Sequence, residues 1–157
     1  MLSTIFGNKF PVGLQNANSL QLSAYDLMAQ GEEFIDLDYR YPIRISNSLK
    51  IECEATSPTS RITYLSRTQA IGKGCSLKFY IEETNVYGEY RVFWKVRNRG
   101  RIAKNKHMLR GEIRECKSIN ETSDFFGSHF VECYIVKNNI CVAKDRISVN
   151  IMNSLAY

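Results

Sequence analysis

From Ile43 onward, apolar and polar residues alternate along the chain. In residues 49–55 the apolar positions are Leu49, Ile51, Cys53 and Ala55, and the residues between them are Lys50, Glu52 and Glu54. A period of two is typical of a β-strand that buries one face and leaves the other in solvent. The same alternation recurs and predicts roughly seven short, half-buried strands, at residues 43–45, 49–55, 77–82, 91–97, 109–114, 131–135 and 146–151.

Turn-forming residues separate these runs. Asn138-Asn139 stands between two apolar segments. Asparagine tolerates the positive φ that both central residues of a type I′ turn need, so we expect a tight hairpin there. Short alternating strands with little helical period predict an all-β fold, an antiparallel β-sandwich of immunoglobulin-like type. The segment Arg61–Ala70 is ambiguous and could form a short helix.

The first 38 residues have a different pattern. Ser23 suits a helix N-cap and Gly31 suits a helix end, which predicts a short helix between them. We therefore divide the chain into an N-terminal extension or linker with a short helix (1–34), a β-sandwich domain (35–152) and a C-terminal tail (153–157).

The composition is that of one globular domain. The chain has 157 residues, of which 44% are hydrophobic and 24% are charged. No apolar run approaches the roughly 18 residues of a membrane span. The first residues also lack the basic and long apolar regions of a secretory signal, so we expect a cytoplasmic protein that does not engage a membrane. The five cysteines form no Cys-x-x-Cys pair, which disfavours a disulfide framework and a zinc site and predicts reduced core thiols.

Positive charge is concentrated in one segment. The formal net charge of the chain is +5, but residues 91–117 alone hold ten Lys or Arg residues against Glu112 and Glu115, a local net of +8. Such a field attracts phosphate groups on a nucleotide, a nucleic acid or an acidic partner. Within this segment, Trp94 continues the apolar alternation and is expected in the core. The basic residues after it suit either phosphate binding or a solvated strand edge.

Catalytic motifs are absent from the sequence. It has no phosphate-binding Gly-x-x-x-x-Gly-Lys-Ser/Thr loop, no Gly-x-Ser-x-Gly elbow and no His-Glu-x-x-His pair. His107 lies in a basic run that suggests a solvated loop. His129 opens a predicted strand, where it is either a hydrogen-bonded residue that fixes a loop or a ligand contact. We expect no enzymatic activity, no cofactor and no metal.

In several blocks of the sequence, the order of the residues is more informative about the protein family than the overall composition. They are WKVRNRG (94–100), LRGEI (109–113), ET (121–122), FGSH (126–129), VECYIVKN (131–138) and CVAKD (141–145). Together, over about residues 33–152, they resemble the adenylyl/guanylyl cyclase and SMODS C-terminal sensor domain (AGS-C) family. The chain departs from the family pattern at Arg101-Ile102-Ala103, where acidic and small residues are usual, and at Asn138-Asn139, where Asn-Gly is usual.

The resemblance implies a non-enzymatic sensor of a nucleotide second messenger, or a related phosphate ligand, in bacterial anti-phage systems such as CBASS. In that family the domain usually follows a cyclase or nucleotidyltransferase. Residues 1–34 are too short for such an enzyme, so we expect either a stand-alone sensor or the C-terminal piece of a longer protein. The predicted ligand-binding residues are Arg97, Asn98, Arg99, Arg110, His129, Glu132 and Tyr134.

All of these residues except Glu132 are given a role by their chemistry. The arginines would bind phosphate, Asn98 and His129 would orient the polar part of the ligand, and Tyr134 or Phe93 would offer a stacking face. Two other functions fit a basic sandwich. One is a docking module for a cyclase, nucleotidyltransferase or effector protein, and the other is a domain that binds phage nucleic acid.

Overall fold

The computed structural model describes residues 31–153. The chain divides into two compact units, residues 1–32 and 33–157, and both β-sheets belong to the second unit. The helix predicted from Ser23 lies outside the described residues. From Gly31 to Asn153, no helix combines the length and the apolar character that a membrane span requires.

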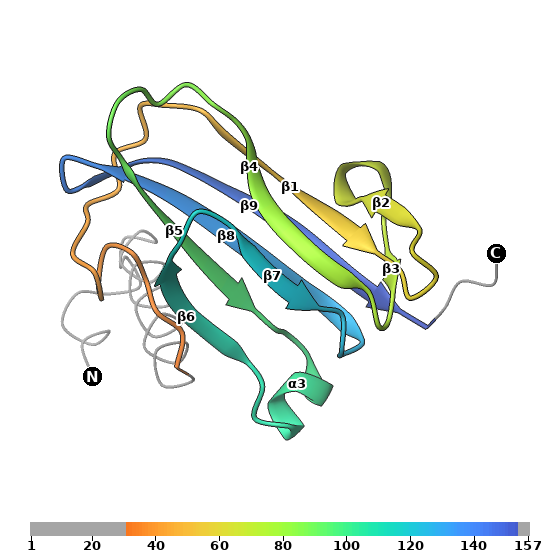
Figure 1. Ribbon diagram of the computed structural model, residues 1–157. Helices are drawn as coiled ribbons and strands as arrows, with labels where there is room; N and C mark the ends of the chain where they lie inside the picture. The colour runs from red at the N-terminus through yellow and green to blue at the C-terminus, as the bar shows by residue number, and fades with distance from the viewer. Residues whose placement is uncertain (1–30, 154–157) are drawn as a thin grey trace, which may run out of the picture. The chain divides into compact units, whose positions relative to one another are not determined.

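Two β-sheets form the domain (Figure 1). The four-stranded sheet has the order β2-β1-β4-β7, with β1 at Leu49–Thr56, β2 at Ile62–Tyr64, β4 at Ser76–Thr84 and β7 at Ile119–Thr122. The five-stranded sheet has the order β3-β9-β8-β5-β6, with β3 at Ile71–Gly72, β5 at Arg91–Arg97, β6 at Arg110–Glu115, β8 at Gly127–Lys137 and β9 at Ile140–Met152. All strand pairs except β3 with β9 are antiparallel. The predicted all-β sandwich is confirmed.

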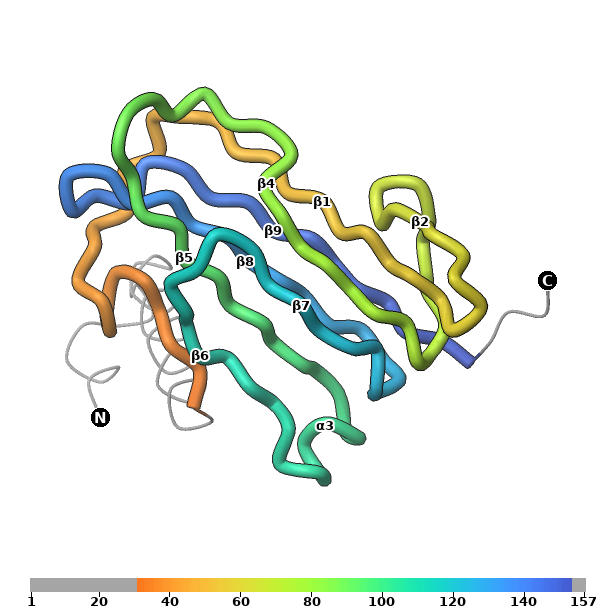
Figure 2. Tube along the Cα trace, viewed as in Figure 1, coloured from red at the N-terminus to blue at the C-terminus, as the bar shows by residue number. Residues whose placement is uncertain are grey.

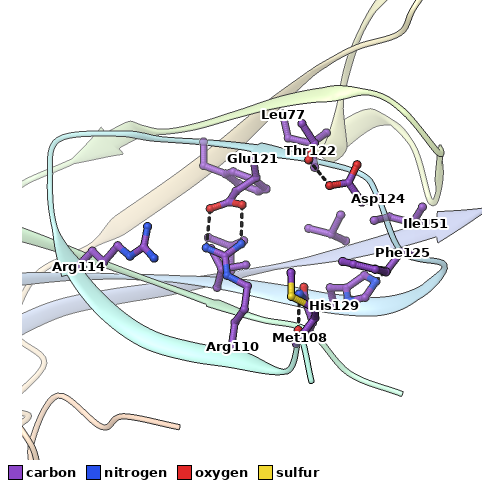
Figure 3. A pocket seen from close by; sticks show the side chains of 15 residues that line it. Leu77, Met108, Arg110, Arg114, Glu121, Thr122, Asp124, Phe125, His129 and Ile151 are labelled. Atoms are coloured by element: carbon purple, nitrogen blue, oxygen red, sulfur yellow. Dashed lines mark hydrogen bonds and ion pairs between the residues drawn. The ribbon is translucent and has the colours of Figure 1, made fainter. Parts of the chain in front are cut away.

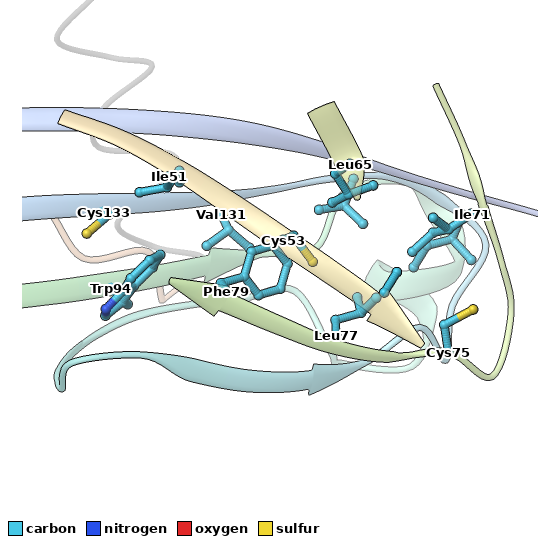
Figure 4. Close-up of a cluster of buried hydrophobic side chains, with 13 residues drawn as sticks. Ile51, Cys53, Leu65, Ile71, Cys75, Leu77, Phe79, Trp94, Val131 and Cys133 are labelled. Atoms are coloured by element: carbon cyan, nitrogen blue, oxygen red, sulfur yellow. The ribbon is translucent and has the colours of Figure 1, made fainter. Parts of the chain in front are cut away.

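The core lies between the two sheets. Cys53 and Phe79 from the four-stranded sheet meet Trp94 and Val131 from the five-stranded sheet, and all four are at most 1% exposed (Figure 4). These residues belong to the apolar half of each alternating run, because a strand places every second side chain on the same face. The expectation that Trp94 belongs to the core is confirmed, and its indole Nε1 donates to the Cys116 carbonyl oxygen at 3.0 Å.

The β8–β9 hairpin has the predicted turn. Its two loop residues, Asn138 and Asn139, have φ values of 50° and 61°. Both values lie in the left-handed region that a type I′ turn requires, and the twist of this turn matches that of the flanking strands. The turn joins the two longest strands of the domain.

The two central strands of the five-stranded sheet, β5 and β8, are buried on both faces over most of their length, which corrects the prediction that they are half-buried. Residues 129–136 of β8 are all buried. The segment just before Pro42 packs over the outer face, where Ile35 and Tyr39 contact a cluster that includes Phe93, Ile113 and Tyr134. The outward residues of β5 and β8 are therefore covered, although their alternation with the core residues suggested a solvated face.

Other differences concern short elements. The strand predicted at 43–45 is reduced to a single parallel bridge between Ile43 and Cys141, because this segment runs beside the start of β9 without continuous pairing. The ambiguous Arg61–Ala70 segment holds β2 and one 3-10 turn, Leu65–Arg67. A five-residue helix, α3 (Arg101–Asn105), connects β5 to β6. Strands β2, β3 and β7 are additional to the predicted ones, since each has at most four residues and shows little alternation.

Candidate functional site

One edge of the sandwich is open, between β6 and β7. Each is the last strand of its sheet, and the chain passes directly from one to the other through residues 116–118 (Figure 2). Across this opening, Arg110 of β6 and Glu121 of β7 form a bidentate ion pair with N–O distances of 2.5 and 2.8 Å. This ion pair, called the clasp below, joins the two sheets.

A local irregularity in β6 positions Arg110. Arg110 and Gly111 have φ values of 56° and 129°, and the register between β5 and β6 shifts after Lys95. The φ at Gly111 is one that residues with a Cβ rarely adopt. The shift places Arg97 opposite Arg110. The guanidinium of Arg97 donates to the Arg110 carbonyl oxygen and so fixes this backbone.

A pocket of about 240 Å³ lies between the two sheets, next to the clasp and on the side of His129 and Phe125 (Figure 3). Its floor is apolar and consists of core residues from both sheets, namely Leu77, Phe79, Val96, Val131, Val149 and Ile151. Its rim is polar and carries Asn98, Arg110, Arg114, Glu121, Thr122, Asp124 and His129, with Met108 and Phe125 beside them. An apolar floor with a few polar groups at the rim is typical of a small-ligand site.

The charges at this rim are balanced. Arg110 and Arg114 supply two cations, and Glu121 and Asp124 supply two carboxylates. Hydrogen bonds to Glu121 raise the pKa of the Arg110 guanidinium further above its ordinary value, so Arg110 keeps its positive charge at neutral pH. The rim therefore offers both donors and acceptors, and the +8 segment does not make this pocket uniformly positive.

His129 is buried at the rim and holds two loops. The Arg99 backbone N–H donates to its Nδ1 at 3.3 Å, and its Nε2 lies 2.9 Å from the Phe125 carbonyl oxygen. Because Nδ1 accepts, the proton is on Nε2, which can then donate to Phe125. This geometry matches the hydrogen-bonded histidine that fixes a loop, one of the two interpretations that the sequence allowed.

The structure brings together three of the seven predicted site residues. Asn98, Arg110 and His129 line the pocket. Asn98 is held in place, since its backbone N–H donates to the Leu109 carbonyl oxygen and its amide donates to the Met108 carbonyl oxygen. Arg99 points to the other face of the sheet, where its guanidinium lies 4.6 Å from the Phe130 ring centroid.

The remaining predicted residues, Arg97, Glu132 and Tyr134, lie on the outer face of the five-stranded sheet. Lys95 Nζ lies 2.9 Å from Glu132, and the Tyr134 hydroxyl donates to the same carboxylate at 2.5 Å. Arg146 Nε also donates to Glu132, at 2.8 Å. The rings of Tyr134 and Phe93 are buried, so neither has an open face on which a base could stack.

Ionisation in this outer cluster follows from its contacts. Burial alone would raise the pKa of the Glu132 carboxyl, but hydrogen bonds from Lys95 and Tyr134 outweigh it and hold that pKa below its ordinary value. Burial and the neighbouring Glu132 carboxylate raise the pKa of Tyr134, which therefore stays protonated and donates. The Lys95–Glu132 pair of this cluster is buried, and the exposed Arg146 side chain reaches it from the surface.

Sequence reasoning did not select Arg114, Glu121 and Asp124 as site residues. The strand that carries Glu121, β7, has four residues and was not predicted. Asp124 follows it in a loop, where it accepts a hydrogen bond from the Thr122 hydroxyl at 2.5 Å. Arg114 was counted in the basic segment, and only the pairing of β6 places it at the rim.

The cysteines and carboxylates do not form a metal site in the part of the chain that the structure describes: residues 31–153 contain no group of three His, Cys, Asp or Glu residues that could hold an ion. All five cysteines are unpaired thiols, and Cys116 is the one that is not fully buried. Burial raises the pKa of the Cys53 thiol to about 12, which makes it unreactive at neutral pH.

Comparison with known proteins agrees with the resemblance in the sequence. Residues 29–152 match the adenylyl/guanylyl and SMODS C-terminal sensor domain. The match covers both sheets and every residue of the pocket. No curated protein sequence matches the chain. Since the matched region is well over half of the chain, this protein belongs to the adenylyl/guanylyl and SMODS C-terminal sensor domain family.

Proposed function

We propose that this domain binds a nucleotide-type signal in the pocket beside the clasp and acts as a non-enzymatic cytoplasmic sensor in a bacterial anti-phage system. The observation that carries the proposal is the pocket itself, which combines an apolar floor with arginines and carboxylates at one rim. Membership of a sensor-domain family supports the same function.

The chemistry of the pocket suits a nucleotide. A base is flat and largely apolar on its faces, which matches the apolar floor of the pocket and the Phe125 ring at its rim. Its edge carries amino donors and ring acceptors, which match the carboxylate of Asp124 and the amide of Asn98. Phosphate at the rim would receive charge-assisted hydrogen bonds from Arg110 and Arg114.

A sensor role also accounts for the state of the pocket histidine. His129 uses both ring nitrogens within the protein, so we infer that it positions the rim and does not transfer protons. Of the predicted residues, Asn98 and Arg110 are then the ones that contact the ligand. Arg97 acts through the backbone of Arg110.

The proposal is tested by isothermal titration calorimetry against a panel of mononucleotides and cyclic mono-, di- and trinucleotides. The variant Arg110→Ala should weaken binding by about 1.5–3 kcal/mol, the contribution of a charge-assisted hydrogen bond. Arg91→Ala is the matched control, because Arg91 pairs with Glu115 away from the pocket. Absence of any binding heat at millimolar concentrations of every ligand would overturn the proposal.

A docking function has its own supporting observation at α3. The connection around this helix carries Arg99, Arg101, Lys104 and Lys106 with no acidic residue, and its apolar residues Ile102 and Met108 are 44% and 41% exposed. Such a surface suits an acidic partner protein. If docking is the main function, Ile102→Glu should abolish co-purification with a neighbouring cyclase or nucleotidyltransferase, and added nucleotides should have no effect on it.

A further inference from the structure

A second cavity lies on the other side of the clasp. It has a volume of about 260 Å³, close to that of the first. Four residues line both cavities: Val96, Arg110, Arg114 and Glu121. The clasp is therefore the partition between two compartments of similar size along the open edge of the sandwich. In Figure 3 the clasp lies between Arg114 on one side and His129 with Phe125 on the other.

The size of the compartments bears on what can bind. Pockets for small ligands usually have volumes of about 300–1,000 Å³. Each compartment alone falls below this range, and the two together, about 500 Å³, fall within it. A ligand that fills both compartments therefore has one bulky part on each side of the clasp. The part that connects them is narrower and lies beside Arg110 and Arg114.

We propose that the two compartments form one binding site for an anionic ligand of two ring-bearing units joined through phosphate, for which a dinucleotide is the simplest case. This inference rests on the proposed function and specifies its ligand. One base occupies the compartment beside His129, the other occupies the compartment beside Asn120, and the linking phosphate takes the place of the Glu121 carboxylate on Arg110.

The clasp has the properties that this exchange needs. A guanidinium binds phosphate and carboxylate in the same bidentate geometry, so a phosphate can replace Glu121 without moving Arg110. The side chains of Arg110 and Glu121 are 22% and 20% exposed, so the released carboxylate can turn into water at little cost. Arg114, which lines both compartments and is exposed, supplies a second cation to the phosphate.

The second compartment also has groups that suit a base. Glu112 and Asn120 offer an acceptor and a donor on opposite sides of it, one from β6 and one from β7. Ile119, which is partly exposed, contributes apolar surface. Binding would release β6 from β7 on one side of the domain while the turn at 116–118 keeps them connected, so the ligand would change how the two sheets are joined.

The test compares two probes by calorimetry: adenylyl-(3′→5′)-adenosine, which has two units and one phosphate, and AMP. We expect the dinucleotide to bind at least 10-fold more tightly. Glu121→Gln should strengthen dinucleotide binding several-fold, because it removes the carboxylate that competes for Arg110. Glu82→Gln is the control, since Glu82 pairs with Lys50 on the other sheet and its change should leave the affinity unaltered.

A blocking variant separates the two compartments. Asn120 is exposed and lines only the second one, so Asn120→Trp should reduce the dinucleotide affinity to that of AMP and leave AMP binding unchanged. Lys117→Trp, a nearby exposed position outside both compartments, is its control, and circular dichroism checks that each variant is folded. If AMP binds and the dinucleotide binds no more tightly than AMP, the proposal of a two-unit site is wrong while the proposed function stands. If neither probe binds and the wider nucleotide panel also fails, both are wrong.

Discussion

The domain contains two cation–carboxylate pairs of similar chemistry in very different surroundings. In the Lys95–Glu132 pair, the side chains are 3% and 12% exposed, and both belong to adjacent strands of one sheet. In the Arg110–Glu121 clasp, the side chains are about one fifth exposed and come from different sheets. The first carboxylate also receives hydrogen bonds from Tyr134 and Arg146.

Burial and the number of donors decide what each pair can do. A buried pair with several donors is costly to break, because removing one partner leaves an uncompensated charge in a poorly solvated place. A partly exposed pair such as the clasp contributes less to stability, because water can replace either partner. The outer-face network is therefore suited to holding the sheet together, and the clasp is suited to exchange with a ligand.

The largest effect should come from breaking the buried pair. Glu132→Gln removes the buried carboxylate that Lys95, Tyr134 and Arg146 contact, so we expect a loss of about 3–5 kcal/mol in the free energy of unfolding. Urea denaturation followed by tryptophan fluorescence measures it, since Trp94 is the sole tryptophan. A loss below about 1 kcal/mol, the range of an exposed pair, would show that the Glu132 network is not what fixes this sheet.

The same carboxyl should make stability depend on pH. The pKa of Glu132 is below its ordinary value of 4.5 in the folded state, so its contribution is complete above that value and is lost as the pH falls through the lower, folded-state pKa. The stability gap between the wild type and Glu132→Gln should therefore shrink on acidification below about pH 4.5. A gap that stays constant from neutral pH down to about pH 3 would contradict this assignment.

The clasp should show a smaller coupling. A double-mutant cycle with Arg110→Ala and Glu121→Ala should give a coupling free energy of about 1–2 kcal/mol, between the values typical of exposed and buried pairs. Denaturation of the two single variants and the double variant measures it. A coupling as large as that of a buried pair would mean that the clasp is structural and does not yield to a ligand.

The exposed Lys50–Glu82 pair sets the lower end of the comparison. Its side chains are 59% and 40% exposed, so solvent screens the attraction. Glu82→Gln should leave the denaturation midpoint and the free energy of unfolding unchanged within the error of urea denaturation. A measurable loss of stability in Glu82→Gln would mean that the exposure of an ion pair does not by itself determine how much each of the three pairs contributes to the free energy of unfolding.

Much of the fold was predictable because the signals were local. Alternation identified β1, β4, β5, β6, β8 and β9, and the Asn138-Asn139 turn followed from the φ that asparagine tolerates. The covering of the outer face was not predictable in this way. It depends on residues 34–41, which fold back over Phe93 and Tyr134. The alternation of apolar and polar residues in β5 and β8 does not indicate that a segment distant in the sequence will cover their outward face.

The candidate site was harder to predict for the same reason. Asn98, Arg110 and His129 belong to blocks that the resemblance singled out, and they do meet at one pocket. Glu121 and Arg114 join them through the pairing of β6 with β5 and of β7 with β4. Arg97 and Tyr134, by contrast, have side chains on the other face of the sheet, because successive residues of a strand point to opposite faces.

The segment around Glu33 has one more consequence, for association between copies of the domain. The Glu33 backbone N–H donates to the Gly111 carbonyl oxygen, its carboxylate accepts from the Ile113 N–H at 2.6 Å, and the Tyr39 hydroxyl donates to the Ile113 carbonyl oxygen at 2.8 Å. These groups occupy hydrogen-bonding positions that an added strand would use on the outer edge of β6. An uncovered edge strand is a template for sheet growth and aggregation, so this short segment removes that template at β6 and leaves the pocket side of β6 open to solutes.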